Sequence, residues 1–207
     1  MCDCPKTSHD PILVALTGGP GAGKTAVLET MRRELCEHVL VLPEAASIVF
    51  GGGFPRERSL PYRCAAQRAI FRVQRELERS AIESRRAAVV LCDRGTIDGV
   101  AYWPMDEASF WLENETTPRS ELARYAAVIH LRTPPPAQYD RRNPLRIEDA
   151  REAAAIDERI ARAWATHPHL HVVPSNHDFL VKVQTAIALV REDVPDCCRM
   201  AARAPAA

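Results

Sequence analysis

The chain has 207 residues, which is enough for one large domain or for a core domain with a small lid. Basic and acidic residues number 27 each, and this zero net charge argues against a broad nucleic-acid-binding or membrane-binding surface. No segment reaches the ~18 apolar residues of a membrane helix, and the amino terminus lacks the apolar core of a signal peptide, so we expect a cytoplasmic protein without a membrane span.

Short apolar runs alternate with helical patterns from Ile12 onward. In chain order they predict a strand at 12–17, a helix at 24–37, a strand at 39–42, a flexible loop at Gly51–Gly53, a helix at about 62–86, a strand at 87–92, mostly helical structure at 98–124, a strand at 126–131, a helix at about 149–166, a strand at 170–173 and a helix at 178–191. This alternation predicts an α/β protein in three layers, with a five-stranded parallel sheet and helices on both of its faces.

These elements predict one domain over residues 12–194, with a basic lid at about 134–148 that begins in a run of prolines. Residues 1–11 are expected to be a flexible amino terminus, and the Ala- and Pro-rich residues 195–207 a disordered tail. Parallel sheets of this kind bind ligands outside the carboxyl ends of their strands. The residues that fall at or just past those ends are Gly18, Glu44, Asp93, Arg132 and Asn176.

A phosphate-binding loop follows the first strand, because Gly18 to Thr25 match G-x-x-x-x-G-K-[ST] between a strand and a helix. Glycines let backbone N–H groups point at phosphate oxygens, and the helix amino terminus adds partial positive charge. Lys24 can reach the β- and γ-phosphates, and the Thr25 hydroxyl can hold Mg²⁺. The residues expected to contact the nucleotide are Gly19, Pro20, Gly21, Ala22, Gly23, Lys24, Thr25 and Ala26, with Asn176 as a candidate at the base.

The nucleotide is expected to be ATP, because the Asn-Lys-x-Asp run that specifies guanine is absent from the sequence. Asp93 ends the third apolar run, where a second carboxylate would organise Mg²⁺, although it could also be an ordinary loop residue. Motor ATPases usually have a glutamate directly after this aspartate, whereas this chain has Arg94. Arg94 is expected to stabilise the transferring phosphate or hold the substrate, or to pair with a neighbouring acid.

Three further residues are candidates for the substrate side of the site. Glu44 follows the second strand and could accept the proton of an attacking hydroxyl, or it could simply begin a surface helix. Gln67 could make two hydrogen bonds to an amide or a base edge, or lie on a solvated helix face. Asp98 could line the same pocket.

The basic stretch after the fourth strand contains Arg141, Arg142 and Arg146. Guanidinium groups can bind phosphate oxygens in pairs and can stabilise the charge that develops during transfer. A lid that closes over the nucleotide would also exclude water. The alternative is a solvated basic loop without a catalytic role.

Several segments together resemble a known family. They are TGGPGAGKT, PEAA, the loop Gly51–Gly53, LCDRGTIDG, VIHLRT and the arginine-rich stretch, and they are similar to the AAA-type P-loop domain of the ribosylnicotinamide-kinase (NadR-like) group. The resemblance covers about Ile12 to Arg191. It implies an ATP- and Mg²⁺-dependent phosphotransferase with Glu44 as base, Arg94 as phosphate or substrate ligand, and a basic lid. The same group includes members that look like nucleotide-dependent binding proteins with phospholipid ligands.

The leading hypothesis is therefore a kinase, acting as a monomer or homodimer, that moves the γ-phosphoryl group of ATP to a hydroxyl of a small, nucleoside-like metabolite, with no nucleic-acid partner. An alternative is a nucleotide-switched ATP- or GTP-binding protein, or a slow NTPase, that acts through a partner or lipid. A motor subunit is disfavoured because no glutamate follows Asp93.

Overall fold

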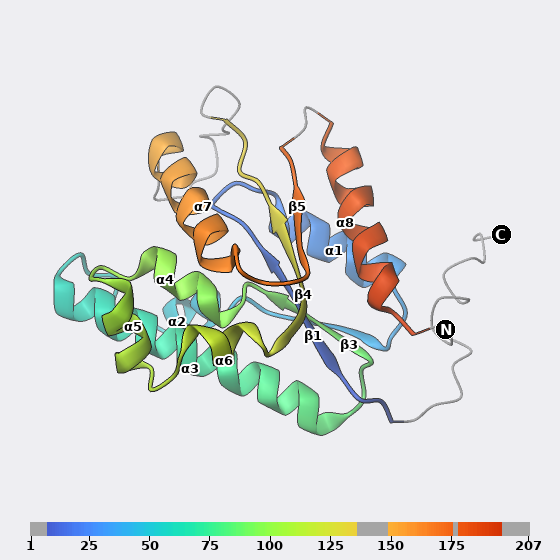
Figure 1. The fold of residues 1–207 in the computed structure, drawn as a ribbon, viewed down its shortest axis with the longest axis horizontal. Helices are drawn as coiled ribbons and strands as arrows, with labels where there is room; N and C mark the ends of the chain where they lie inside the picture. The colour runs from blue at the N-terminus through green and yellow to red at the C-terminus, as the bar shows by residue number, and fades with distance from the viewer. Residues whose placement is uncertain (1–7, 136–148, 176–177, 196–207) are drawn as a thin grey trace.

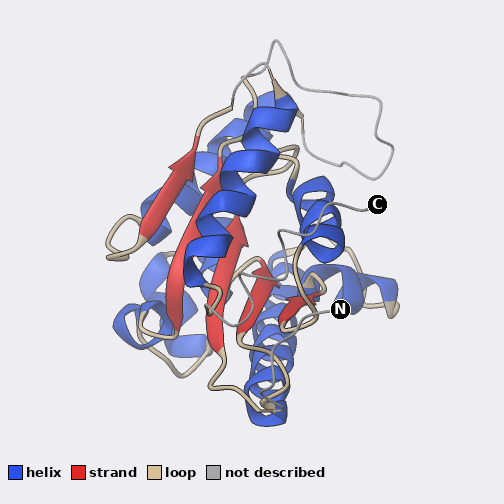
Figure 2. Ribbon diagram, turned by 90° about the vertical axis from the view of Figure 1, so that its right-hand side faces the viewer, coloured by secondary structure: helices blue, strands red, loops and turns tan. Residues whose placement is uncertain are grey.

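A computed structural model describes residues 8–135, 149–175 and 178–195. Its centre is a five-stranded sheet of order β2-β3-β1-β4-β5, in which all neighbouring strands are parallel (Figure 2). The strands are β1 (Ile12–Thr17), β2 (Val39–Leu42), β3 (Val89–Asp93), β4 (Tyr125–Leu131) and β5 (Leu170–Val173). The predicted fold class is confirmed.

Helices cover both faces of the sheet (Figure 1). They are α1 (Lys24–Glu34), α2 (Ala45–Gly51), α3 (Leu60–Ser84), the 3-10 helix η1 (Thr96–Asp98), α4 (Gly99–Tyr102), α5 (Glu107–Glu113), α6 (Pro118–Leu122), α7 (Ala150–Trp164) and α8 (Phe179–Asp193). Helices α1 and α8 lie together on one face, and α3 to α7 lie on the other.

The two faces have separate apolar cores, and β1 contributes to both. Leu13 and Ala15 belong to the core under α3 and α7, whereas Val14 and Leu16 belong to the core under α1 and α8. A strand buried on both faces has apolar residues at consecutive positions. This explains why the run before the glycines was readable as a strand from the sequence.

Two local predictions differ from the structure. Gly51, predicted to lie in a loop, is the last residue of α2, a helix that the sequence indicated only as an alternative role for Glu44. A helix of seven residues is too short to show a clear helical apolar period. Strand β3 begins at Val89 and ends at Asp93, whereas the prediction was 87–92; Asp93 pairs in register with Leu16 of β1.

The strand order places the functional segments side by side. Since β1 is hydrogen-bonded to β3 and β4, the loop after β1 lies between the carboxyl ends of those two strands. The backbone N–H of Arg94 continues this pairing by donating to the Leu16 carbonyl oxygen at 3.1 Å. Within the described ranges, no helix combines the length and apolar character needed to cross a bilayer.

Candidate functional site

The loop Gly18–Thr25 has a backbone that glycine makes possible. Gly18 has φ +138°, and a Cβ there would lie 2.1 Å from the carbonyl oxygen of Leu131 in β4. Gly23 has φ +92°, and a Cβ there would meet the Phe179 ring at 2.7 Å. Neither position tolerates a side chain, so the loop can curl tightly against β4 and α8 before α1 begins at Lys24.

Side chains from distant elements hold this loop from outside. Lys182 of α8 donates to the carbonyl oxygens of Ala22 at 3.0 Å and Arg132 at 2.8 Å. The Thr133 hydroxyl donates to the Pro20 carbonyl oxygen at 3.2 Å. The bonds to Ala22 and Pro20 engage carbonyl groups of the loop, whereas an anion would bind its backbone N–H groups.

Lys24 folds back over the loop. Its ammonium group donates to the carbonyl oxygens of Gly18 at 2.9 Å and Gly19 at 3.2 Å, and the residue is 9% exposed. Burial, helped by the nearby charge of Arg94, lowers the pKa of Lys24 from 10.5 to about 8. The carboxylates of Asp93, Glu44 and Asp98 oppose this shift without outweighing it, and a triphosphate placed in the loop would add further negative charge.

Asp93 fits a role in holding Mg²⁺. Its Oδ1 is buried and has no hydrogen-bond partner among the described residues, and burial raises the pKa of its carboxyl group in spite of Lys24 and Arg94. Magnesium prefers hard oxygen ligands and usually keeps several waters and substrate oxygens. Asp93 and the exposed hydroxyl of Thr25 are the oxygen ligands that this chain would supply, directly or through water.

Arg94 occupies a strained position next to Asp93. Its φ of +75° lies in the left-handed region, which non-glycine residues seldom adopt and which is often found at functional sites. Its guanidinium group binds Glu44 Oε1 at 2.8 Å, the Gly18 carbonyl oxygen at 3.2 Å and Asp98 Oδ2 at 3.3 Å. It also lies 5.4 Å from the centre of the Tyr102 ring. Arg94 therefore joins the phosphate loop to the acidic residues beside it.

Glu44 is the N-cap residue directly before α2, in agreement with the prediction that it begins a helix. Its carboxylate binds Arg94, and it accepts a hydrogen bond from the Ser47 hydroxyl at 2.5 Å. Burial opposes ionisation, but Arg94 and Ser47 outweigh it, so the pKa of Glu44 falls below its usual value. Glu44 is thus an ionised acceptor beside the phosphate loop, and a weak base.

Asp98 and Gln67 differ in burial and in their surroundings. Asp98 is 2% exposed, and its oxygens accept hydrogen bonds from the Thr17 hydroxyl at 2.6 Å and the Trp164 indole at 2.7 Å, in addition to Arg94. Both oxygens of Asp98 are therefore engaged inside the protein, where the carboxylate holds Arg94. Gln67 is partly exposed, and its Oε1 lies near Gly99 at the start of α4.

The predicted lid residues Arg141, Arg142 and Arg146, and Asn176 at the base, lie outside the described residues. Among the residues that contact the site and that sequence reasoning missed are Asp157, Trp164 and Lys182. Asp157 left a signal, because it is a charged residue beside Ile156, Ile160 and Trp164 on the buried face of α7. A carboxylate on an apolar helix face requires partners inside the protein.

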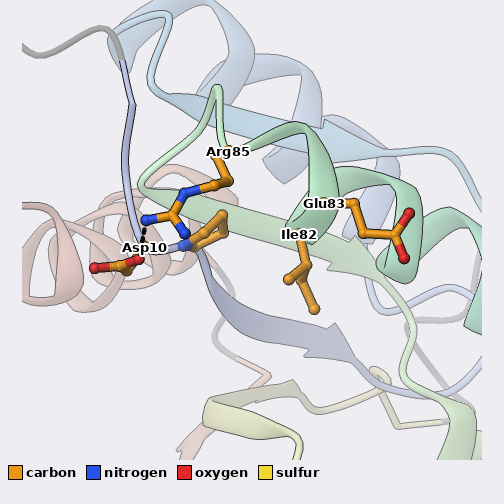
Figure 3. A pocket seen from close by; sticks show the side chains of 5 residues that line it. Asp10, Ile82, Glu83 and Arg85 are labelled. Atoms are coloured by element: carbon orange, nitrogen blue, oxygen red, sulfur yellow. Dashed lines mark hydrogen bonds and ion pairs between the residues drawn. The ribbon is translucent and has the colours of Figure 1, made fainter.

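One open hollow lies away from this site (Figure 3). Asp10, Pro11, Ile82, Glu83 and Arg85 line it at the amino end of β1, and Arg85 forms an ion pair with Asp10 across it. Parallel sheets bind ligands at the opposite edge, where the strands end. The position of this hollow therefore argues against a role in nucleotide binding.

The sheet, the glycine loop and the buried lysine and aspartate define a P-loop nucleotide-binding protein. Residues 13–179 match the AAA_28 family model, described as an AAA domain, and the chain belongs to this family of P-loop NTPases. The comparison with curated proteins gave no match. Membership implies nucleotide binding, and NTP hydrolysis or phosphotransfer as the class of activity.

Proposed function

We propose that this chain is a Mg²⁺-dependent kinase that transfers the γ-phosphoryl group of ATP to a hydroxyl of a small, nucleoside-like metabolite. The observation that carries the proposal is the pair Arg94–Glu44 at 2.8 Å, directly beside the carbonyl of Gly18. Motor ATPases usually have a glutamate directly after this aspartate, Asp93. This chain instead has a half-buried cation at that position, which suits a transferring phosphoryl group.

The residues divide the work in the following way. The loop backbone and Lys24 bind the triphosphate, and bound Mg²⁺, held by Thr25 and Asp93, would neutralise charge on the phosphate oxygens. Glu44 accepts a hydrogen bond from the acceptor hydroxyl and orients it. Because the transition state of phosphoryl transfer is loose, a carboxylate of low pKa is sufficient for this role. The NadR-like resemblance supports the same assignment, and Arg141, Arg142 and Arg146 are proposed to close over the phosphates.

The test is mass spectrometry of a reaction that contains the protein, Mg²⁺-ATP and a pooled panel of nucleosides and other hydroxyl metabolites. We expect a product heavier by one phosphate group, absent with Lys24→Ala and strongly reduced with Glu44→Gln. The replacement Glu83→Gln, remote from the site in the hollow of Figure 3, serves as a matched control and should leave the product unchanged.

A second candidate is a nucleotide-switched binding protein or slow NTPase. The observation in its favour is the folded-back Lys24, whose bonds to Gly18 and Gly19 must break when a triphosphate binds, so the loop differs between its two states. Under this alternative Glu44→Gln has no effect on the output, and the reaction releases only ADP and free phosphate. A large change in protease sensitivity on ATP binding would then accompany the absence of a phosphorylated product.

A further inference from the structure

Helix α7 contacts two parts of the site, the phosphate loop and the group of residues around Arg94, through two side chains that are seven residues apart. Asp157 and Trp164 lie on its buried face and are 2% and 0% exposed. Asp157 reaches the phosphate loop, and Trp164 reaches the acidic residue that binds Arg94. In Figure 1 the helix runs along the sheet on the same face as α4.

The contact of Asp157 with the phosphate loop is specific. Its Oδ1 accepts a hydrogen bond from the backbone N–H of Gly19 at 2.9 Å, and the same carboxylate binds His130 at 2.9 Å and Arg132 at 3.1 Å. A Cβ on Gly19 would lie 2.7 Å from the Cβ of Asp157, so the loop and the helix are in direct contact. Charge-assisted hydrogen bonds of this kind are about twice as strong as neutral ones.

Trp164 contacts the residues around Arg94. Its indole N–H donates to Asp98 Oδ1 at 2.7 Å, while Asp98 Oδ2 binds Arg94 at 3.3 Å and Thr17 at 2.6 Å. The Trp164 ring also packs against Gly95, the residue after Arg94, because a Cβ on Gly95 would lie only 2.6 Å from the ring. The indole therefore fixes the carboxylate that orients the guanidinium group.

We propose that α7 sets the geometry of the whole site through these two positioning residues: Asp157 fixes the phosphate loop for the triphosphate, and Trp164 fixes Arg94 through Asp98 for phosphoryl transfer. The Trp164 half rests on the function proposed above, whereas the Asp157 half needs nucleotide binding alone. The two substitutions therefore act on different quantities, the affinity for nucleotide and the rate of turnover.

The first experiment measures the Kd of Mg²⁺-ATP by isothermal titration calorimetry. We expect Asp157→Ala to raise Kd about tenfold, the effect of losing one charge-assisted hydrogen bond. Asp157→Asn keeps an oxygen acceptor for the Gly19 N–H, so its Kd should lie between those of the wild type and Asp157→Ala. It also replaces the alanine variant if that variant does not fold. The matched control is Glu158→Gln, which loses only the exposed pair of Glu158 with Arg132 and should bind like the wild type. Unchanged affinity in Asp157→Ala would overturn this half.

The second experiment compares Trp164→Phe with Trp111→Phe. Both lose an indole hydrogen bond, but the partner of Trp111 is Glu107 of α5, away from the site. We expect kcat to fall about tenfold in Trp164→Phe with Kd for Mg²⁺-ATP unchanged, and neither to change in Trp111→Phe. Equal kcat in both variants, or a fall in affinity instead of kcat, would overturn this half. A wild-type protein that binds ATP without any turnover would refute the proposed function and leave the Asp157 result standing.

Discussion

Lys24 carries a charge in a buried position, and its replacement by methionine tests what that burial costs the folded protein. Methionine keeps most of the apolar stem and removes the ammonium group. The fall of the Lys24 pKa from 10.5 to about 8 corresponds to about 3 kcal/mol of destabilisation of the charged form at neutral pH. Removing the charge therefore removes an unfavourable contribution to the folding free energy of the nucleotide-free protein.

The lost hydrogen bonds offset only part of this gain. The Gly18 carbonyl keeps the Arg94 guanidinium as a donor at 3.2 Å, and the Gly19 carbonyl keeps the N–H of Ala22 at 3.3 Å, so neither oxygen is left without a partner. Allowing about 1 kcal/mol for weaker bonding, we expect Lys24→Met to raise the free energy of unfolding by about 1–2 kcal/mol at pH 7. The melting temperature should rise by roughly 2–8 °C, while ATP binding is lost.

The dependence on pH gives this prediction a direction. The unfolded chain has its Lys24 pKa near 10.5 and the folded chain near 8, so between these values the unfolded state binds more protons. Wild-type stability from this group therefore increases as the pH rises from 8 to 10.5. Urea unfolding of both proteins should show the largest advantage of the variant below pH 8, and this advantage should vanish and change sign before pH 10.5. A methionine variant less stable than the wild type at pH 7, or an advantage that stays constant with pH, would refute the reasoning.

Three other substitutions test separate parts of the structure. Gly18→Ala should lower the free energy of unfolding by more than about 2 kcal/mol in urea, because the new Cβ meets a β4 carbonyl oxygen at 2.1 Å, whereas Gly51→Ala has open space and should change it by less than about 1 kcal/mol. Glu44→Gln should reduce phosphotransfer about 100-fold, measured by product formation, because the acceptor hydroxyl and Arg94 both lose their charged partner, with the Kd of ATP within about threefold of wild type. Arg124→Leu should destabilise the protein by about 3 kcal/mol in urea, because it leaves the carboxylate of Glu78, 0% exposed, without its cation; a loss below about 1 kcal/mol would contradict this.

The sequence predicted the sheet well, for physical reasons that particular residues show. The run from Ile12 to Thr17 is buried on both faces of the sheet, so its apolar character is continuous. The glycines of the phosphate loop mark its end. The loop Gly18–Thr25 was identifiable because phosphate binding by backbone N–H groups fixes both residue type and spacing. The pairing of Arg94 with a neighbouring acid was among the predictions, since few other partners suit a buried guanidinium.

The supporting contacts were harder to predict. Asp98 was expected to face a substrate, yet it is enclosed by Thr17, Trp164 and Arg94, because a carboxylate four residues after an arginine can turn inward as easily as outward. Asp157 touches the phosphate loop across 138 positions of sequence, and no local pattern encodes such a contact. Pairings of this kind depend on how whole elements pack, which spacing along the chain does not determine.

The central place of β1 in the sheet has a consequence for biosynthesis. The phosphate loop is synthesised before α8, because the Lys182 ammonium that holds its Ala22 carbonyl lies 160 residues later in the chain. Contacts that span such distances in sequence form late in folding. The loop of a nascent chain thus lacks this contact until α8 has been synthesised and packed. A nucleotide that binds the finished loop more tightly than the unfinished one would favour chains in which α8 has docked.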